Sequence, residues 1–383
     1  MQITNVEPIL VSSRYGKGGV LGQPLGVKTL GFVRVTTDSG FIGYGEAYSA
    51  IYVPELFEKI IQHMKPFLIG KDPTNPIKVY ENFHIPFVSR SGLYKSAYSA
   101  VDIALWDIAA HYHGKSVAVL IDEGAKKEVS VYASGGSAAF DSSQIEEDLK
   151  ILMGKGHTHY KMRVGFQDWE TDLERVQTAR QGLSGNGCLM VDAIMGSIHP
   201  AWNLDIAVVR AKDLEQFSLT WLEEPLPPDQ IDDYRKLSRG TLIPIAAGEA
   251  LASRGEFESY LLANCVSILQ PDVTHCGGIS AAIDICRMAE KFRIPLALHV
   301  WGSALAFKAN AALALAFQGV EWLEFPSVNL ELSNEILREP IVTINGTYLS
   351  SNEIGFGIEI DETLIIRFPY IPGSGFQMPL RAK

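Results

Sequence analysis

The sequence predicts an α/β fold in which eight parallel strands close into a barrel, accompanied by a small α+β domain. Two observations support this prediction. From about residue 127 onward, short apolar runs alternate with helical patterns, and polar residues end most of the runs. Successive polar ends are roughly 25 to 30 residues apart, the length of one strand, one helix and two short loops. The expected strands are Val129–Ser134, His159–Val164, Cys188–Asp192, Leu219–Glu223, Ile243–Gly248, Val266–Gln270, Ile294–His299 and Val320–Glu324.

Near-continuous apolar runs of this kind are typical of parallel strands that helices cover. Seven helical patterns lie between the eight runs, so the predicted barrel lacks one outer helix. Barrels of this type place their active sites at the C-terminal ends of the strands, where the polar residues of this chain are found. The helical patterns include Gln144–Met153, Trp169–Leu183 and Ile279–Phe292.

The first 125 residues have a different pattern. Leu30–Thr37 and the run around Phe41–Tyr44 predict two strands joined by a turn at Thr37–Gly40. Helical patterns follow at Val53–Met64 and Gly92–Tyr112. Strands followed by helices predict a small α+β domain.

Two other segments stand apart from these units. Five glycines in the segment Ser13–Gly26 predict a mobile loop, because such a segment does not easily form a regular element. The tail from about residue 327 has short β-like and turn segments at Pro340–Asn345 and Gly355–Ile360, and we expect it to return to the N-terminal domain. The predicted division is therefore 1–125 for the N-terminal part of the α+β domain, 126–326 for the barrel and 327–383 for the returning segment.

Composition excludes several classes of function. The 383 residues carry a net charge of −11, which argues against a nucleic-acid partner, because phosphate binding needs a basic surface. Charged residues or glycines interrupt the apolar stretches, so no membrane span is expected. The first residues lack the basic and apolar regions of a signal peptide. The four cysteines have no metal-type spacing and are expected to be reduced packing residues of a cytoplasmic protein.

Three acids at successive strand ends, Asp192, Glu223 and Glu249, predict a metal site. Adjacent barrel strands lie about 4.8 Å apart, so the three carboxylates can converge on one point. Bare carboxylates in such a group repel one another, and a divalent cation removes the conflict. All-oxygen ligands favour Mg²⁺ over Zn²⁺. The alternative is that these acids cap helices or pair with basic residues.

Four further residues suggest acid–base chemistry. Lys161 and Arg163 are two positions apart on one strand and face the same way, so they would bind or polarise an anionic substrate, or else pair with the three acids. Asp272 and His299 follow adjacent strands, and an Asp beside a His makes a competent general base. The alternative for His299 is a core histidine without a catalytic role.

These residues lie in motifs that together resemble the mandelate racemase branch of the enolase superfamily. The resemblance covers nearly the whole chain, including Gly43–Glu46 and Asp102–Asp107 in the N-terminal part. The residues after His299 resemble sugar-acid dehydratases and acid-sugar lactone cycloisomerases more than mandelate racemase. The barrel motifs are Lys161–x–Arg163, Val191–Ala193, Trp221–Pro225, Gly248–Glu249, Gln270–Asp272, Gly277–Gly278 and His299.

The resemblance implies an α+β capping domain over a modified (β/α)7β barrel of the TIM type. It implies that Asp192, Glu223 and Glu249 bind Mg²⁺, that Asp272 and His299 form a base, and that Glu324 hydrogen-bonds the substrate carboxylate. It also implies that Ser13–Gly26 closes over the substrate as a lid. The expected partner is a small carboxylate, either a sugar acid or a lactone, and we expect a homo-oligomer of unspecified size.

Two departures from the family pattern bear on the chemistry. Arg163 stands where the family usually has a second lysine that commonly serves as a base, and arginine is not deprotonated in proteins. Ile194 stands where the family often has asparagine. The muconate-lactonizing branch carries a lysine at the position of Asp272, so the chain departs from that branch as well.

The implied chemistry is removal of the proton α to a carboxylate, with Mg²⁺ and Lys161 stabilising the enediolate and His299 moving the proton. With Arg163 unable to act as a base, one-base dehydration of a sugar acid fits best. Lactone cycloisomerisation uses the same groups, and two-base racemisation or epimerisation fits less well. A metal-dependent aldolase or phosphatase barrel remains an alternative from another class, and a non-catalytic sugar-acid binding protein is a weaker one.

Overall fold

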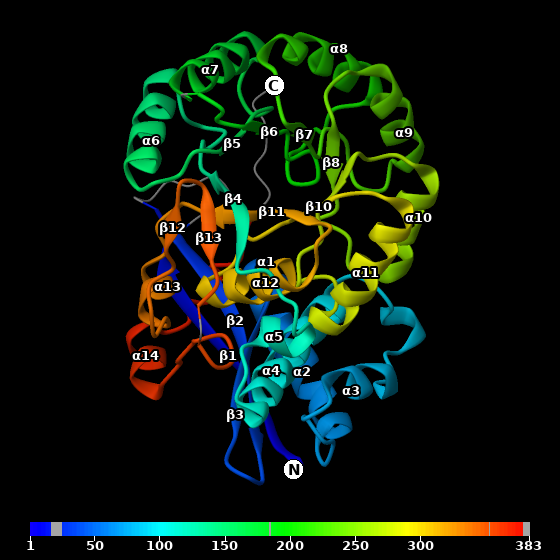
Figure 1. The fold of residues 1–383 in the computed structure, drawn as a ribbon, viewed down its shortest axis with the longest axis vertical. Helices are drawn as coiled ribbons and strands as arrows, with labels where there is room; N and C mark the ends of the chain where they lie inside the picture. The colour runs from blue at the N-terminus through cyan, green and yellow to red at the C-terminus, as the bar shows by residue number, and fades with distance from the viewer. Residues whose placement is uncertain (17–24, 184, 352, 378–383) are drawn as a thin grey trace.

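The computed structural model describes residues 1–16, 25–183, 185–351 and 353–377. Its largest unit is a barrel of eight parallel strands, β4 to β11, each paired with the next along the chain, and β11 pairs back with β4. In Figure 1, helices α6 to α10 form an arc around these strands. The predicted barrel fold is confirmed. The strands are β4 (Glu128–Ser134), β5 (Tyr160–Arg163), β6 (Leu189–Asp192), β7 (Trp221–Glu223), β8 (Ile245–Ala247), β9 (Ile268–Leu269), β10 (Leu296–Leu298) and β11 (Val320–Pro326).

Among the described residues, seven α-helices connect these strands, as the alternating pattern predicts. The helices expected at Gln144–Met153, Trp169–Leu183 and Ile279–Phe292 are present with bounds that differ by two residues at most. A short 3-10 helix, η2 (Glu215–Phe217), follows α8. The connecting helices are α6 (Ser142–Gly154), α7 (Trp169–Gly182), α8 (Leu204–Leu214), α9 (Ile231–Gly240), α10 (Arg254–Ala263), α11 (Gly278–Phe292) and α12 (Ala304–Ala316).

Local sequence explains where several of these helices begin. Asp141 and Gln144 form a capping box at the start of α6, in which each side chain accepts a hydrogen bond from the other residue's backbone N–H. Asp168, Asn203 and Ser303 cap α7, α8 and α12 in the same way with a single bond. Every residue of β6 and β7 is buried, because helices cover the outside of the barrel and side chains fill its interior.

The N-terminal unit is an antiparallel sheet of three strands in the order β1-β2-β3, with helices packed on it. Figure 1 shows it in blue and cyan below the barrel. The expected strands and helices of this region are present, and the capping-domain architecture is confirmed. The elements are β1 (Ile3–Arg14), β2 (Val27–Thr37), β3 (Ile42–Ala47), α1 (Ser49–Tyr52), α2 (Pro54–Leu68), α3 (Pro76–Asn82), η1 (Phe87–Ser89), α4 (Leu93–His113) and α5 (Val117–Ile121).

Helix α4 joins the capping sheet to the barrel. The backbone N–H of Ser280, in the first turn of α11, donates to Oδ2 of Asp102 at 2.9 Å. The indole N–H of Trp106 donates to the Ser280 hydroxyl at 3.0 Å. Asp102 therefore satisfies a free N–H at the start of a barrel helix from across the domain boundary. A Cβ on Gly278 would lie 2.4 Å from Asp102, which explains why a glycine stands there.

The prediction of a loop at Ser13–Gly26 is wrong at its first residues. Ser13 and Arg14 are the end of β1 and pair with Lys28 and Val27 of β2. Tyr15 continues this contact, since its backbone N–H donates to the carbonyl of Gly26 at 3.1 Å. Residues 17–24 of the expected lid lie outside the described residues, so the lid stays a prediction.

The C-terminal segment divides between the two units. A hairpin of β12 (Thr343–Ile344) and β13 (Thr347–Leu349) pairs antiparallel with β4, so this part joins the barrel rather than the cap. Helix α14 (Glu362–Arg367) and the residues after it lie along β1, where Val11 forms a bridge with Pro369. A short helix, α13 (Glu331–Glu335), precedes both. The domain limits at 125 and 326 stay a prediction.

Two further sequence expectations concern helices and cysteines. Among the described residues, no helix combines the length and the apolar character that crossing a membrane requires. All four cysteines are free thiols, and three of them are buried: Cys265, Cys276 and Cys286.

The close contact between β3 and α4 gives a test of the fold. A Cβ on Gly45 would lie 1.9 Å from the carbonyl oxygen of Ala100, so Gly45→Ala forces the helix away from the sheet. We expect this variant to lose about 1–3 kcal/mol of unfolding free energy, measured by urea denaturation. Gly255→Ala in α10 is the matched control, because its Cβ meets no atom within 4 Å and alanine favours a helix. Wild-type stability of Gly45→Ala would contradict this packing.

Candidate functional site

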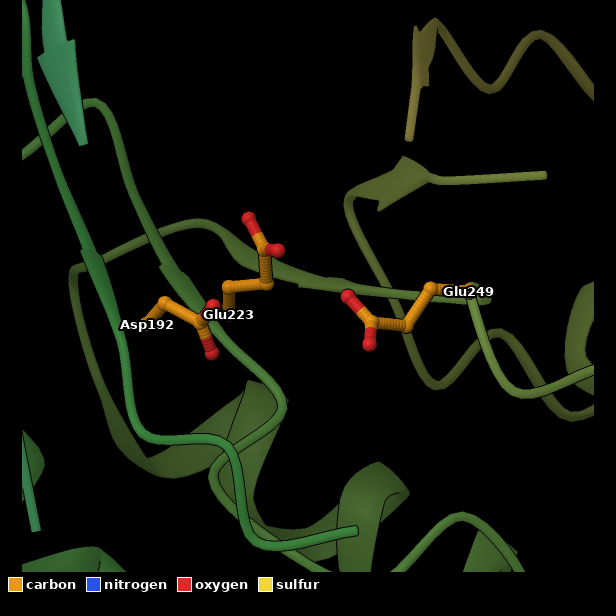
Figure 2. A group of neighbouring side chains, drawn as sticks. All are labelled: Asp192, Glu223 and Glu249. Atoms are coloured by element: carbon orange, nitrogen blue, oxygen red, sulfur yellow. The ribbon is translucent and has the colours of Figure 1, made fainter. Parts of the chain in front are cut away.

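Three carboxylates meet at the C-terminal ends of adjacent barrel strands. Asp192 is the last residue of β6, Glu223 is the last of β7, and Glu249 follows β8 by two positions. Figure 2 shows Glu249 extending toward the other two side chains from the opposite side. One oxygen from each residue lies within 4.8 Å of the others. The structure thus brings together the three acids that the strand-end pattern selects.

Backbone geometry holds Asp192 in place. The backbone N–H of Ile194 donates to Oδ1 of Asp192 at 2.8 Å, which requires the chain to turn sharply after β6. Ile194 has a φ of 46°, in the left-handed region that β-branched residues rarely adopt. Asparagine, the usual family residue, tolerates this conformation better. The departure at Ile194 therefore places strain beside the site while the hydrogen bond to Asp192 remains.

Glu223 has partners on both carboxylate oxygens. Its Oε1 accepts from Nζ of Lys161 at 2.5 Å. Its Oε2 accepts from the Trp221 indole at 2.8 Å and from the Gln270 amide at 2.7 Å. Neither Trp221 nor Gln270 was assigned a role from the sequence. The spacing of two between Trp221 and Glu223 places them on the same side of β7 and was the available signal.

The site carries more buried negative charge than its basic residues can balance. Glu224, Asp272 and Glu324 are also buried there. Burial raises the pKa of Asp192, and the nearby charge of Glu223 raises it further. The pKa of Glu224 is likewise raised by burial and by the other carboxylates, and its Oε1 has no hydrogen bond from any described residue. This donor set of oxygens fits a divalent cation of the Mg²⁺ type.

Lys161 is the cation at the centre of this group. Besides Glu223, its Nζ lies 3.0 Å from Oε1 of Glu324 and 3.6 Å from Oδ2 of Asp192. Burial alone would lower the pKa of Lys161, but attraction to Glu223 and Glu324 outweighs it and raises the pKa well above its usual value. Lys161 is therefore charged at neutral pH.

Arg163 lies at the edge of the same group. Its guanidinium donates to the carbonyl of Gly135 at 2.9 Å and to the hydroxyl of Ser134 at 3.1 Å, and its Nε lies 3.9 Å from Oδ2 of Asp192. Burial would lower its pKa, but Asp192 and Glu324 raise it above the ordinary value for arginine. Arg163 can therefore bind an anion but cannot accept a proton.

His299 and Asp272 form the expected pair. Nδ1 of His299 lies 2.9 Å from Oδ2 of Asp272, while its Nε2 lies 3.3 Å from Oε2 of Glu249. Asp272 is itself fixed, because its Oδ1 accepts from the backbone and hydroxyl of Thr274 and from the amide of Asn310. Neither Thr274 nor Asn310 was selected from the sequence. These contacts orient the ring so that Nε2 faces the three carboxylates.

The pKa of His299 is raised to about 9. Burial alone would lower it, but the charges of Glu249 and Glu324 and the hydrogen bond to Asp272 raise it. The same bond helps to lower the pKa of Asp272 although burial opposes this. The pair is therefore an imidazolium and a carboxylate while Glu249 keeps its full negative charge.

Glu324 is ionised in this arrangement. Burial would raise its pKa, but Lys161, His299 and Arg163 lower it to about 2. Its Oε2 accepts from the backbone N–H of Val300 at 3.1 Å. The role that the resemblance implies, a hydrogen bond to a substrate carboxylate, therefore requires Glu324 to gain a proton first, because two carboxylates cannot share a bond without one.

Aromatic residues from the cap cover His299, and none of them was selected from the sequence. The ring of Tyr48, between β3 and α1, stands edge-on to His299 with centroids 5.6 Å apart. Its hydroxyl lies 2.9 Å from that of Tyr52. Trp301 packs against both tyrosines. No periodic pattern marks these residues, and Tyr48 directly follows the observed strand β3 rather than the predicted run around Phe41–Tyr44.

Comparison with known families agrees with this geometry. A family profile described as Enolase C-terminal domain-like matches residues 144–364. A second, described as Mandelate racemase / muconate lactonizing enzyme, N-terminal domain, matches residues 24–122. The chain belongs to the mandelate racemase/muconate lactonizing enzyme family of the enolase superfamily. The resemblance drawn from the motifs is confirmed, and the chain is an enzyme of this superfamily.

Named relatives are similar to this chain over most of its length. L-talarate/galactarate dehydratase of Salmonella typhimurium is 30% identical over 344 residues, which are 89% of this chain and 82% of the relative. D-galactarolactone cycloisomerase of Agrobacterium fabrum is 28% identical over 349 residues, 88% of this chain and 90% of the relative. A racemase from Streptomyces coelicolor, solved with bound magnesium, has a TM-score of 0.83 at 25% identity and covers 96% of this chain and 99% of its own.

The raised pKa of His299 can be measured directly. In the chelator-treated protein we expect the ring to titrate near pH 9, followed by NMR of the imidazole protons. Asp272→Asn removes a hydrogen bond to the charged ring and should lower this pKa, so that the ring loses its proton at lower pH. His63→Asn, on the exposed face of α2, serves as the assignment control. A His299 pKa near 6.5 in both proteins would contradict the pairing.

Proposed function

We propose that this enzyme removes the proton α to the carboxylate of a sugar acid and then eliminates the β-hydroxyl, so that it is a sugar-acid dehydratase. The observation that carries the proposal is His299 held by Asp272, with Nε2 3.3 Å from one member of the three-carboxylate group. A base thus faces the place where a substrate carboxylate would bind. The names of the relatives, dehydratases and a cycloisomerase acting on sugar acids, support the same chemistry.

Asp192, Glu223 and Glu249 would hold Mg²⁺. When bound, this ion would neutralise negative charge that develops on the substrate carboxylate. Lys161 would stabilise the same charge, since it is already held as a cation. Arg163 would contact the substrate as a fixed cation. Glu324, once protonated, would donate a hydrogen bond to the substrate carboxylate.

One base accounts for all the proton transfers of the proposed dehydration. A cation held by the three carboxylates would offset the charge of Glu249, which raises the pKa of His299, and would so leave the imidazole neutral. Nε2 of neutral His299 then accepts the α-proton, and the electron pair of the broken C–H bond passes into the substrate carboxylate. The β-hydroxyl then leaves as water, taking the proton that His299 received. The resulting enol tautomerises to a 2-keto-3-deoxy acid. Substrate minus water equals product, and His299 ends neutral, as it began.

Two alternatives within the family keep the same residues. A lactone cycloisomerase would use His299 for β-elimination of the ring oxygen, with no loss of water. A racemase or epimerase would need a second base on the opposite face, and Arg163 cannot supply one. Screening hexarates, hexonates and their lactones for a 2-keto-3-deoxy product separates dehydration from the other two reactions.

The metal assignment predicts three equivalent losses. Asp192→Ala, Glu223→Ala and Glu249→Ala should each abolish Mg²⁺ binding, measured by calorimetry, and turnover of the sugar acid. The control is Asp232→Ala, which removes an exposed carboxylate from α9 and should change neither. Full turnover of the wild-type enzyme in excess chelator would show that the three acids serve another purpose.

The base assignment predicts loss of exchange. His299→Asn should lower turnover on the order of 10²- to 10⁴-fold, since it removes the only proposed base on its face of the substrate. It should also lose exchange of the substrate α-proton with deuterated water, followed by NMR. His63→Asn should keep both. Exchange by His299→Asn at a near wild-type rate would place the base elsewhere, and absence of exchange in the wild type would favour an aldolase or phosphatase reaction.

A further inference from the structure

A buried lysine of the cap, Lys28, lies beside the proposed active site without an acidic partner among the described residues. It belongs to β2 and is 1% exposed. Its Nζ lies 4.0 Å from the ring centroid of Trp301 and 4.7 Å from that of Tyr15, so two aromatic faces enclose the ammonium. The Trp301 indole in turn donates to the Tyr15 hydroxyl at 3.0 Å.

Several observations place Lys28 at the barrel mouth. Nζ donates to the backbone carbonyl of Trp301, two residues after His299. Burial lowers the pKa of Lys28 to about 7; the charges of Glu324 and Asp272, which belong to the site, oppose the lowering, and that of Arg163 adds to it. Lys28 therefore reaches from the cap toward the residues that surround His299.

No described carboxylate neutralises this lysine. The strongest opposing charge is that of Glu46, but Glu46 is occupied at the start of α12, where it accepts from the backbone and hydroxyl of Ser303 and from the backbone of Ala306. Two other buried lysines have acidic partners, since Lys161 pairs with Glu223 and Lys308 lies 2.9 Å from Glu353, whereas the buried Lys95 donates to the Tyr80 hydroxyl. An ammonium has three donors, and Lys28 uses one within the described residues.

A buried, unpaired cation is costly and is neutralised when an anion can reach it. We propose that Lys28 binds an anionic group at the end of the substrate remote from the three-carboxylate group, so that the preferred substrates are sugar acids with a carboxylate at each end. The inference rests on the proposed function, since it assigns the second end of the same substrate. Tyr15 and Trp301 would enclose that end and exclude water from it.

A purely structural role is the rival explanation. Lys28 would then only join β2 to the segment after β10, and its loss would affect all substrates equally. A matched pair of substrates separates the two explanations. Galactarate and galactonate share their configuration from C2 to C5 and differ at C6, which is a carboxylate in galactarate and a hydroxymethyl group in galactonate.

We expect wild-type enzyme to favour galactarate, or the dicarboxylate of another such pair. Lys28→Met, which removes the charge and keeps most of the side-chain length, should raise KM for the dicarboxylate on the order of 10- to 100-fold with kcat little changed. It should leave KM for the monocarboxylate unchanged. Lys95→Met is the matched control, because Lys95 is also a buried cap lysine over a tyrosine ring, but it donates to Tyr80 away from the site.

Each outcome decides one claim. Equal losses for both substrates in Lys28→Met, or a wild-type kcat/KM that does not favour the dicarboxylate, would overturn the role of Lys28. The second measurement needs no variant and remains decisive if Lys28→Met does not fold. Absence of α-proton exchange with every acid would overturn the proposed function instead, so the two failures are distinguishable.

Discussion

A closed parallel barrel brings several carboxylates together at the C-terminal ends of its strands, and the rest of the molecule is arranged under this constraint. Parallel strands all present their C-terminal ends to the same mouth, so the acids that end β6 and β7 or follow β8 cannot avoid one another. Lys161 compensates part of this negative charge, because its Nζ lies within 3.6 Å of carboxylate oxygens of Asp192, Glu223 and Glu324. Burial raises the pKa of Asp192 and Glu249, the remaining negative charge raises it further, and this charge suits a divalent cation.

The strand ends are also where the backbone is strained. Ile194 and Glu224 adopt left-handed conformations with φ of 46° and 40°, and Gly248 has a φ of 140° just before Glu249. Each follows or precedes a member of the carboxylate group. Left-handed conformations of such residues cost on the order of 1–3 kcal/mol each. The barrel tolerates this cost because closure between β11 and β4 and the buried strands hold the mouth rigid.

The features that were predicted from the sequence are those that repeat along the chain, and the features that were missed are irregular. The period of strand and helix is dictated by burial, so α6, α7 and α11 lie within two residues of their expected bounds. Polar residues at strand ends stand out against that period, and all eight predicted site residues meet at one mouth. In contrast, β1 was not predicted, because Glu7 and Pro8 interrupt its apolar pattern.

Contacts between segments that are distant in the sequence were also not predicted. Trp221 and Asn310 support Glu223 and Asp272 through hydrogen bonds that no local pattern records. Tyr48 and Lys28 reach the site only because the cap folds back over the barrel. Pairing of β13 with β4 likewise joins distant segments, since it adds an antiparallel strand to one end of β4. Such contacts follow from tertiary structure and not from periodicity.

The positions of the charged groups bear on stereochemistry. His299 is held on one side by Asp272, and the cation on the other side, Arg163, is fixed by Ser134 and Gly135 and cannot exchange protons. A substrate held at one end by the three-carboxylate group and its cation, and at the other end by Lys28, would be unable to rotate so as to exchange the face toward His299 for the face toward Arg163. It would present one face of its α-carbon to one base. Retention of the proton on a single base favours elimination, in which His299 returns the proton to the leaving group, over inversion of the carbon centre.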